Sequence, residues 1–273
     1  MRPHLFIAVL AVAASALTVP QTAAATPAVD AELVLQAVHA KDALGNALHY
    51  FDDALARRKR EVTVPAVQAQ TIESLGHRIY PPRNLYKIFT VAYTQAIPPA
   101  TLTALQQWLS TVKGLKFRRA LDQAYKASSH TRKAYFAKAG SSVLKGNRRN
   151  ALKTYIKATT QEEFYAVFQV EMDYSVLRGL NGFAQPGGRD TPRYLKEKTA
   201  PHKSGYIDNG RNLAFTFDAY AFKDLHDDEI DDLSKFATSA VGQAHTKAMA
   251  QALVSTLDAA AATLEAQVIK GTK

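Results

Sequence analysis

Residues 102–124 read LTALQQWLSTVKGLKFRRALDQA, and residues 230–252 read IDDLSKFATSAVGQAHTKAMAQA. At an offset of 128, five aligned positions are identical and three carry similar apolar side chains. In each segment apolar residues recur at helical spacing, a glycine then permits a sharp turn or a tight helix crossing, and alanines follow. We predict a helix–Gly–helix repeat unit in each, within about 97–125 and 225–253. Coincidence between alanine-rich helices is the alternative.

The chain on either side of these segments is also typical of helices. Residues 31–56 carry apolar side chains at helical spacing, and prolines at 65, 81–82 and 98–99 separate further helical stretches. Thr160-x-x-Glu163 predicts a capping box before another apolar stretch. Residues 185–211, rich in Gly, Pro and charge, are expected to form a long loop. No period-2 run bounded by hairpin turns is present. We therefore predict an all-α multi-helix bundle of about ten helices.

The N-terminus indicates export. Arg2 precedes the apolar run LFIAVLAVAASAL of residues 5–17, which is too short to span a membrane, and Ala23 to Ala25 supply a small-residue cleavage pattern. We predict a signal peptide over residues 1–25, a single domain over 26–273, and a periplasmic or secreted location. A buried N-terminal helix is the alternative. The mature chain shows no other apolar run long enough to cross a membrane, so no transmembrane span is expected there.

The second segment carries a recognisable pattern. Phe236-x-x-Ser239-x-x-Gly242, preceded by Glu229-Ile230-x-x-Leu233, resembles a family of secreted proteobacterial all-helical domains of unknown function. The first segment is similar but has Trp for Phe and Thr for Ser, and it lacks the acid; two copies also depart from the family's usual single one. The resemblance implies an envelope location and an all-helical fold, and it supplies no catalytic residues.

Composition and motifs exclude several chemistries. The 273 residues are 47% hydrophobic and contain no cysteine, which permits a full core and excludes disulfides, thiolate metal sites and cysteine nucleophiles. Zincin, serine-hydrolase, phosphate-loop and calcium-loop motifs are absent. His49 with Asp52 and Asp53 shares a helix face, but we interpret it as a solvated face, and we expect no metal and no cofactor. The acidic run 226–232 is interpreted as complementing a helix dipole, with a cation site as the alternative.

Glu171 is the one candidate for acid–base chemistry. On a helical wheel of residues 161–178 it falls among apolar side chains, while Glu162, Gln169 and Asp173 form the polar side. A carboxyl group there should be paired or have a raised pKa. It is either a general acid or polar anchor in a cleft, or a structural partner of Arg178 or a tyrosine; we favour the structural interpretation.

The charge distribution is the best indication of function. Residues 113–157 hold thirteen Lys or Arg and one acid, Asp122, so their net charge of +12 exceeds the +10 of the whole chain. The candidate anion-binding residues lie along one predicted helix: Lys145, Arg148, Arg149, Lys153 and Lys157. Such a segment attracts polyanions, although a solvated face or neutralisation by the acids of 224–232 is the alternative. An exported protein would meet anionic lipids or cell-envelope polymers, and we expect no nucleic acid.

Three classes of function follow from these patterns. The favoured one is a non-catalytic binding or accessory module at the cell envelope. The second is a structural or interaction protein that forms homo-oligomers or binds a protein partner through the helix–Gly–helix units. The third is a cell-wall glycan-acting enzyme that uses Glu171, which we rank last because the sequence offers no second placed carboxylate.

Overall fold

The computed structural model describes residues 30–139 and 145–271, and it holds helices and no strand in that part of the chain. The prediction of an all-α multi-helix bundle is therefore confirmed. The predicted signal peptide lies outside the described residues. The first half contains α1 (Ala31–Ala37), α2 (Ala40–Ala43), a 3₁₀ turn η1 (Leu44–Asn46), α3 (Ala47–Glu61), α4 (Ala66–Ile79), α5 (Pro82–Ala96), α6 (Pro99–Leu109) and α7 (Val112–Lys126). The second half contains α8 (Ser129–Ala139), α9 (Gly146–Ala158), α10 (Gln161–Asn181), η2 (Pro186–Gly188), α11 (Pro192–Thr199), α12 (His202–Ala221), α13 (Asp227–Thr238) and α14 (Ala240–Gly271).

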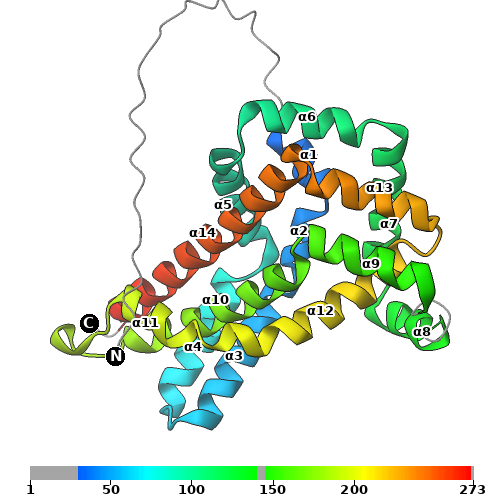
Figure 1. The fold of residues 1–273 in the computed structure, drawn as a ribbon. Helices are drawn as coiled ribbons and strands as arrows, with labels where there is room; N and C mark the ends of the chain where they lie inside the picture. The colour runs from blue at the N-terminus through cyan, green and yellow to red at the C-terminus, as the bar shows by residue number, and fades with distance from the viewer. Residues whose placement is uncertain (1–29, 140–144, 272–273) are drawn as a thin grey trace, which may run out of the picture.

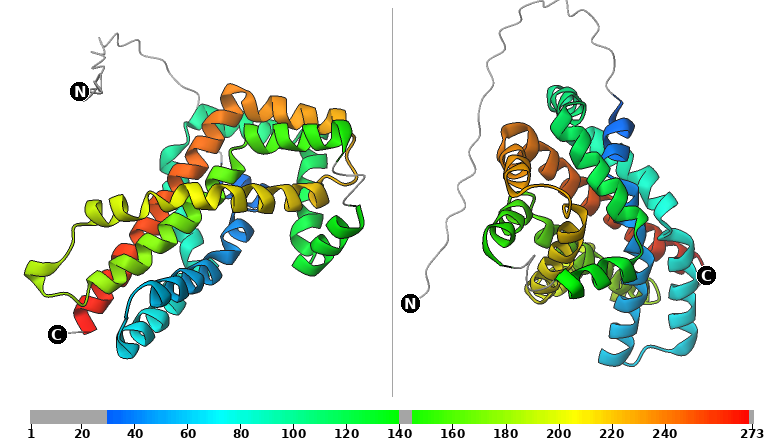
Figure 2. Two further views of the ribbon diagram at one scale, coloured as in Figure 1. Left: turned by 60° about the horizontal axis from the view of Figure 1, so that its bottom comes forward. Right: turned by 90° about the vertical axis from the view of Figure 1, so that its right-hand side faces the viewer.

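Two helices organise the bundle. The long α14 runs diagonally through the domain, and α10 packs against both α14 and α12 (Figure 1). The hairpin of α3 and α4 lies at one end, whereas α8, α9 and α13 lie at the other (Figure 2). Buried apolar side chains gather in a larger core around α1–α6, α10 and α14 and in a smaller core around α7, α9, α12 and α13. Trp108 and Phe117 contact both cores.

Local chemistry explains where many helices begin. Proline occupies the first turn of α5, α6 and α11, where its missing N–H costs nothing. Asp30 caps α1 through its side chain, and Thr191 caps α11. His226 and Glu229 form a reciprocal capping box at α13, whose first turn is acidic. The interpretation of the 226–232 run as a helix start is thus consistent with the fold.

Two predictions about connections are wrong. Most of residues 185–211 is helical, because they contain α11 and the first half of α12. Gly210, which suggested a loop, lies where α12 crosses α10 so closely that a Cβ would sit 2.6 Å from the carbonyl oxygen of Glu162. The capping box at Thr160 does not form, because Thr160 adopts a left-handed conformation (φ 50°) and its side chain makes no cap hydrogen bond. That conformation turns the chain from α9 into α10 within two residues.

The long helix α14 also meets the length and composition of a membrane span. Of its most apolar window, 44% is buried inside the domain. Its side chains Leu253, Leu257 and Leu264 are fully buried in the larger core. The core helix of a folded domain meets the same criterion, so we interpret α14 as a core helix.

Candidate functional site

The first helix–Gly–helix segment forms a tight corner between α6 and α7. The Thr111 hydroxyl accepts a hydrogen bond from the Gly114 N–H (3.1 Å) and donates one to the carbonyl of Trp108 (2.7 Å). A Cβ at Gly114 would overlap that carbonyl oxygen and lie 2.6 Å from the Cα of Leu109. Glycine is therefore required by the close approach of the two helices.

The second segment forms a corner of the same kind between α13 and α14. The Ser239 hydroxyl accepts from the Gly242 N–H (3.2 Å) and donates to the carbonyl of Phe236 (2.6 Å). A Cβ at Gly242 would overlap that carbonyl and lie 2.7 Å from the Cα of Ala237. The segments differ beyond the corner, because α7 has 15 residues and α14 has 32. The shared corner supports the proposal of an internal repeat, which otherwise stays a prediction.

The two corners face each other. The rings of Trp108 and Phe236 stack with centroids 3.8 Å apart and planes inclined by 8°. Leu102, Leu105 and Leu109 are buried, as expected from their helical spacing. The same spacing places Val112 on that buried face, and this expectation is wrong: Val112 lies past the corner and is 74% exposed.

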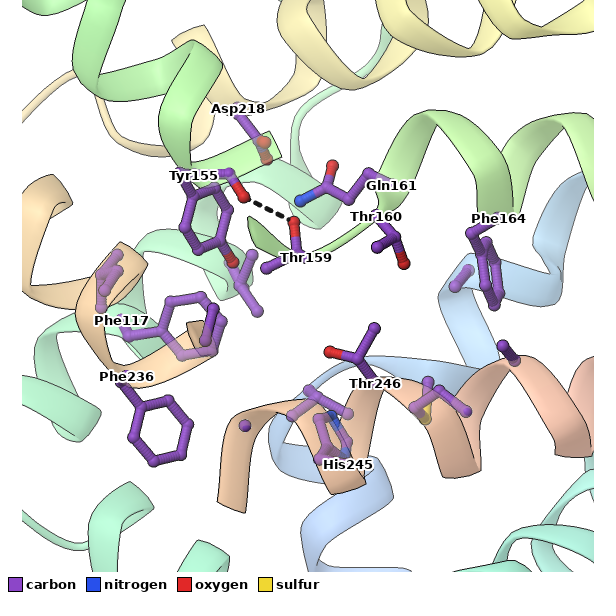
Figure 3. Close-up of a pocket in the computed structure, with 18 of the residues that line it drawn as sticks. Phe117, Tyr155, Thr159, Thr160, Gln161, Phe164, Asp218, Phe236, His245 and Thr246 are labelled. Carbon is purple, nitrogen blue, oxygen red and sulfur yellow. Dashed lines mark hydrogen bonds between the residues drawn. The ribbon is translucent and has the colours of Figure 1, made fainter. Parts of the chain in front are cut away.

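A partly open cavity of about 270 Å³ lies beside this aromatic stack. Its wall is built mainly by α6, α7, α9, α10, α12, α13 and α14, so it lies between the two cores and borders both corners. Apolar and aromatic side chains make up most of the wall. Figure 3 shows Asp218 and Gln161 on one side of an open space and His245 and Thr246 on the other.

Asp218 is the most unusual group in this wall. It is 1% exposed, and its Oδ2 has no hydrogen-bond partner among the described residues. Burial raises its pKa from the usual range to about 8, and hydrogen bonding to the Gln161 side chain only partly opposes that rise. At neutral pH it is therefore largely a neutral acid when the cavity is empty.

The tyrosines around Asp218 are also buried. Burial raises the pKa values of Tyr125, Tyr155 and Tyr165 well above 10, and the nearby carboxyl group of Asp218 adds to each rise. On the opposite wall, burial lowers the pKa of His245 to about 4, and its Nδ1 is hydrogen-bonded to the Tyr93 hydroxyl (2.8 Å). All four groups are thus neutral at pH 7.

Glu171 lies outside this cavity. It is 8% exposed on α10, and its Oε2 lies 3.9 Å from Lys196 Nζ, too far for a hydrogen bond. Burial raises its pKa, as predicted. The predicted structural partner Arg178 instead binds Glu265 (2.7 Å) and the hydroxyl of Tyr174 (3.1 Å), because α14 packs along that side of α10.

Two of the three residues assigned to the polar side of α10, Gln169 and Asp173, are buried as well. Asp173 is 9% exposed and accepts hydrogen bonds from Arg57 (2.8 Å) and Tyr206 (2.7 Å), with His202 Nδ1 at 2.9 Å. The helical wheel predicted the wrong environment for these residues because neighbouring helices surround α10 on nearly every side. Sequence patterns could not identify three partners that come from α3 and α12.

The candidate anion-binding residues divide into two groups. Lys145, Arg149, Lys153 and Lys157 are exposed, and none forms an ion pair with an acid that the structure describes. Arg148 was wrongly grouped with them. It turns into the fold, donating to the carbonyls of Phe222 and Leu225 and to Asp227 (3.1 Å), and so fastens the loop before α13.

Part of the predicted neutralisation by the acidic run also occurs. Lys113 pairs with Asp232 (2.6 Å), and Lys116 pairs with Glu229. Both carboxyl groups accordingly have lowered pKa values, through hydrogen bonds from these lysines. Glu229 and Asp232 are therefore paired with α7, and neither forms an ion pair with the four exposed cations at α9.

The His49 group is divided by the fold. His49 Nε2 lies 3.5 Å from Asp53, while Asp52 pairs with His77 (2.9 Å) on α4. Within residues 30–139 and 145–271, no three His, Asp or Glu side chains are arranged to hold a metal ion.

Sequence reasoning missed Asp218 although a signal was present. It is the single charged residue in the run FTFDAYAF, residues 215–222. An isolated carboxyl among aromatic residues is the same pattern that singled out Glu171. Its neighbours Gln161 and Thr160 carried no such signal.

No family model, curated protein or solved structure matches the chain. The resemblance to secreted helical domains therefore stays a prediction. Any function has to be argued from the site itself.

Proposed function

We propose that this protein is a non-catalytic binding module that is exported to the periplasm or the cell exterior and docks on anionic phospholipid headgroups of the envelope. The observation that carries the proposal is the row of exposed cations on α9, defined as Lys145, Arg149, Lys153 and Lys157. Lys145 is the N-cap residue of α9, with an extended backbone, and Arg149, Lys153 and Lys157 recur every four residues along one side of the helix. We call them the α9 row.

Charge complementarity supports an anionic surface as the partner. Three acids of the nearby run, Asp227, Glu229 and Asp232, pair with Arg148, Lys116 and Lys113, and no described acid of the run forms an ion pair with the α9 row. Each Lys or Arg beside an anionic membrane contributes about 1 kcal/mol of binding, and salt screens the attraction. The export signal proposed for residues 1–25 would bring the domain to such a surface.

The other two classes lack a supporting observation of this kind. An interaction protein would use the apolar faces of the two corners, but Trp108 and Phe236 cover each other within the chain. A glycan-acting enzyme would need Glu171 in a cleft, whereas Glu171 does not line the cavity. We therefore favour the binding module.

Vesicle co-sedimentation tests the proposal. The full mature chain should bind vesicles containing phosphatidylglycerol and not pure phosphatidylcholine vesicles, and binding should fall steeply between ~0.05 and ~0.5 M salt. Changing the whole α9 row to glutamine should weaken binding at least tenfold, since four contacts of about 1 kcal/mol are removed.

A matched variant controls for net charge. Lys59, Arg60, Arg83 and Lys87 are also exposed cations, on α3 and α5. Changing these four to glutamine removes the same charge and should reduce binding much less. Equal, salt-insensitive binding to both vesicle types, or equal losses in the two variants, would overturn the proposal.

A further inference from the structure

We propose that the cavity beside the two corners binds a small organic ammonium ion, whose apolar body packs among the aromatic side chains and whose positive charge pairs with Asp218. This site is separate from the α9 row. It does not depend on the proposed docking or on the location of the protein.

Charge is the first argument. The chain carries 34 Lys and Arg against 24 Asp and Glu, yet none of the described residues that line the cavity is a lysine or arginine. The lining contains two carboxyl groups, Asp218 and Glu163, and the neutral His245. An anionic ligand would find no cation there, whereas a cationic ligand would find Asp218.

The unpartnered oxygen of Asp218 is the second argument. Leaving a buried polar atom without a hydrogen bond destabilises the fold, so such atoms call for an explanation. Oδ2 of Asp218 is buried at the cavity wall and has no hydrogen-bond partner among the described residues. A ligand cation would pair electrostatically with the carboxylate and so offset that destabilisation.

The aromatic wall is the third argument. The rings that line the cavity include Trp108, Phe117, Tyr125, Tyr155, Phe164 and Phe236. The face of an aromatic ring attracts a cation, and aromatic cages are the usual sites for quaternary ammonium groups. An engineered cavity of about 150 Å³ holds benzene. A cavity of about 270 Å³ is therefore large enough for a benzyl group with a trimethylammonium head.

The groups that face Asp218 predict how binding depends on pH. They are Gln161 and Tyr165 from α10, Tyr125 from α7 and Tyr155 from α9, with Arg132 of α8 beyond, over the ring of Phe217 at 5.6 Å. The raised pKa values of the tyrosines keep them neutral below pH 10. Asp218, with a pKa of about 8, ionises between pH 7 and 9. A quaternary ammonium ion, which does not titrate, should then bind about tenfold more tightly at pH 9 than at pH 7.

Trp108 provides the measurement. It is the only tryptophan of the chain and it lines the cavity, so its fluorescence reports occupancy directly. We would titrate the protein with benzyltrimethylammonium, with its neutral carbon isostere neopentylbenzene, and with the anion phenylacetate. The ammonium should bind at least about tenfold more tightly than the isostere, and phenylacetate should bind least.

Two amide variants separate this site from general effects. Asp218→Asn should weaken ammonium binding at least about tenfold, remove its dependence on pH and leave the isostere unchanged. Glu171→Gln, which neutralises a buried carboxyl group outside the cavity, should change none of the three affinities. If Asp218→Asn does not fold, the tenfold rise of wild-type affinity between pH 7 and 9 still tests the proposal.

Several results would overturn the inference. They are equal affinities for the ammonium and the isostere, tighter binding of phenylacetate, wild-type binding by Asp218→Asn, and no fluorescence change with any compound. The vesicle assay is independent of all of these. Failure at the cavity and failure at the α9 row can therefore be told apart.

Discussion

Asp173 and Asp218 are both buried near the contact between α10 and α12, but their surroundings are opposite. Asp173 receives hydrogen bonds from Arg57 and Tyr206 and contacts His202. Asp218 lies among aromatic rings, and its Oδ2 has no partner in the described part of the chain. A carboxyl group with its donors supplied stabilises the fold. A carboxyl group with one oxygen left without a partner beside a cavity indicates a place for a ligand.

The largest expected effect is on the pH dependence of stability. The pKa of Asp218 is higher in the folded state than in the unfolded state. Its contribution to the free energy of unfolding is therefore fully present below about pH 4, where the group is neutral in both states, and is lost as the pH rises to about 8. Asp218→Asn cannot ionise and should escape that loss. We compare the free energy of unfolding of the variant with that of the wild type at each pH. The difference, variant minus wild type, should be larger at pH 9 than at pH 4 by on the order of 5 kcal/mol. Urea denaturation of both proteins measures this, and parallel pH profiles would contradict it.

The next largest contrast in stability is expected from two glycines, one near Asp218 at the cavity and one near Asp173. Gly242, at the cavity wall, approaches the backbone of Phe236 and Ala237, which cannot move without opening the corner. Gly242→Ala should cost about 3 kcal/mol or more. Gly205, next to Tyr206 on α12, has open space where a Cβ would lie, with nothing within 4 Å, so Gly205→Ala should gain about 0.5–1 kcal/mol. Thermal melts of the two variants check the opposite signs.

Removing the charge of Asp173 should destabilise the protein, in contrast to Asp218. Asp173→Asn leaves Arg57 without its carboxylate partner at 2.8 Å, so we expect a loss of about 2 kcal/mol at pH 7. Ammonium binding at the cavity should stay unchanged. Denaturation and the Trp108 titration on the same variant test both statements, and a gain in stability would contradict the assigned role.

Glu171→Gln should have the smallest effect. Its Oε2 has no hydrogen-bond partner among the described residues, Lys196 Nζ is 3.9 Å away, and burial raises its pKa, so the charged form gains little from the fold. The free energy of unfolding should change by less than about 1 kcal/mol at pH 7. Loss of ammonium binding in this variant would show that the Glu171 region and the cavity are not separate.

The same contrast shows how far sequence reasoning reaches. Helical periodicity and the Gly114 and Gly242 positions predicted the all-α fold and the bends, because these signals are local. The positions of Gly210 and Asp173 depend on which helix crosses which, and that information is not local. Gly210 therefore suggested a loop, and Asp173 was placed on a polar face.

The partners of charged residues were predicted less well for the same reason. Arg178 was assigned to Glu171, seven residues away, but pairs with Glu265 across the bundle. Arg148 was assigned to the surface but binds carbonyls of the loop before α13. Long side chains reach groups that are distant in sequence, so spacing along one helix does not identify their partners.

The most direct test of the contrast between the two aspartates is a carbon-13 NMR titration of the Asp218 carboxyl group with and without benzyltrimethylammonium. We predict a pKa of about 8 in the free protein, and a fall below about 6 when the ammonium ion is bound. An ordinary pKa near 4 in the free protein, or a pKa that the ammonium ion leaves unchanged, would contradict the assignment of Asp218 to a ligand site.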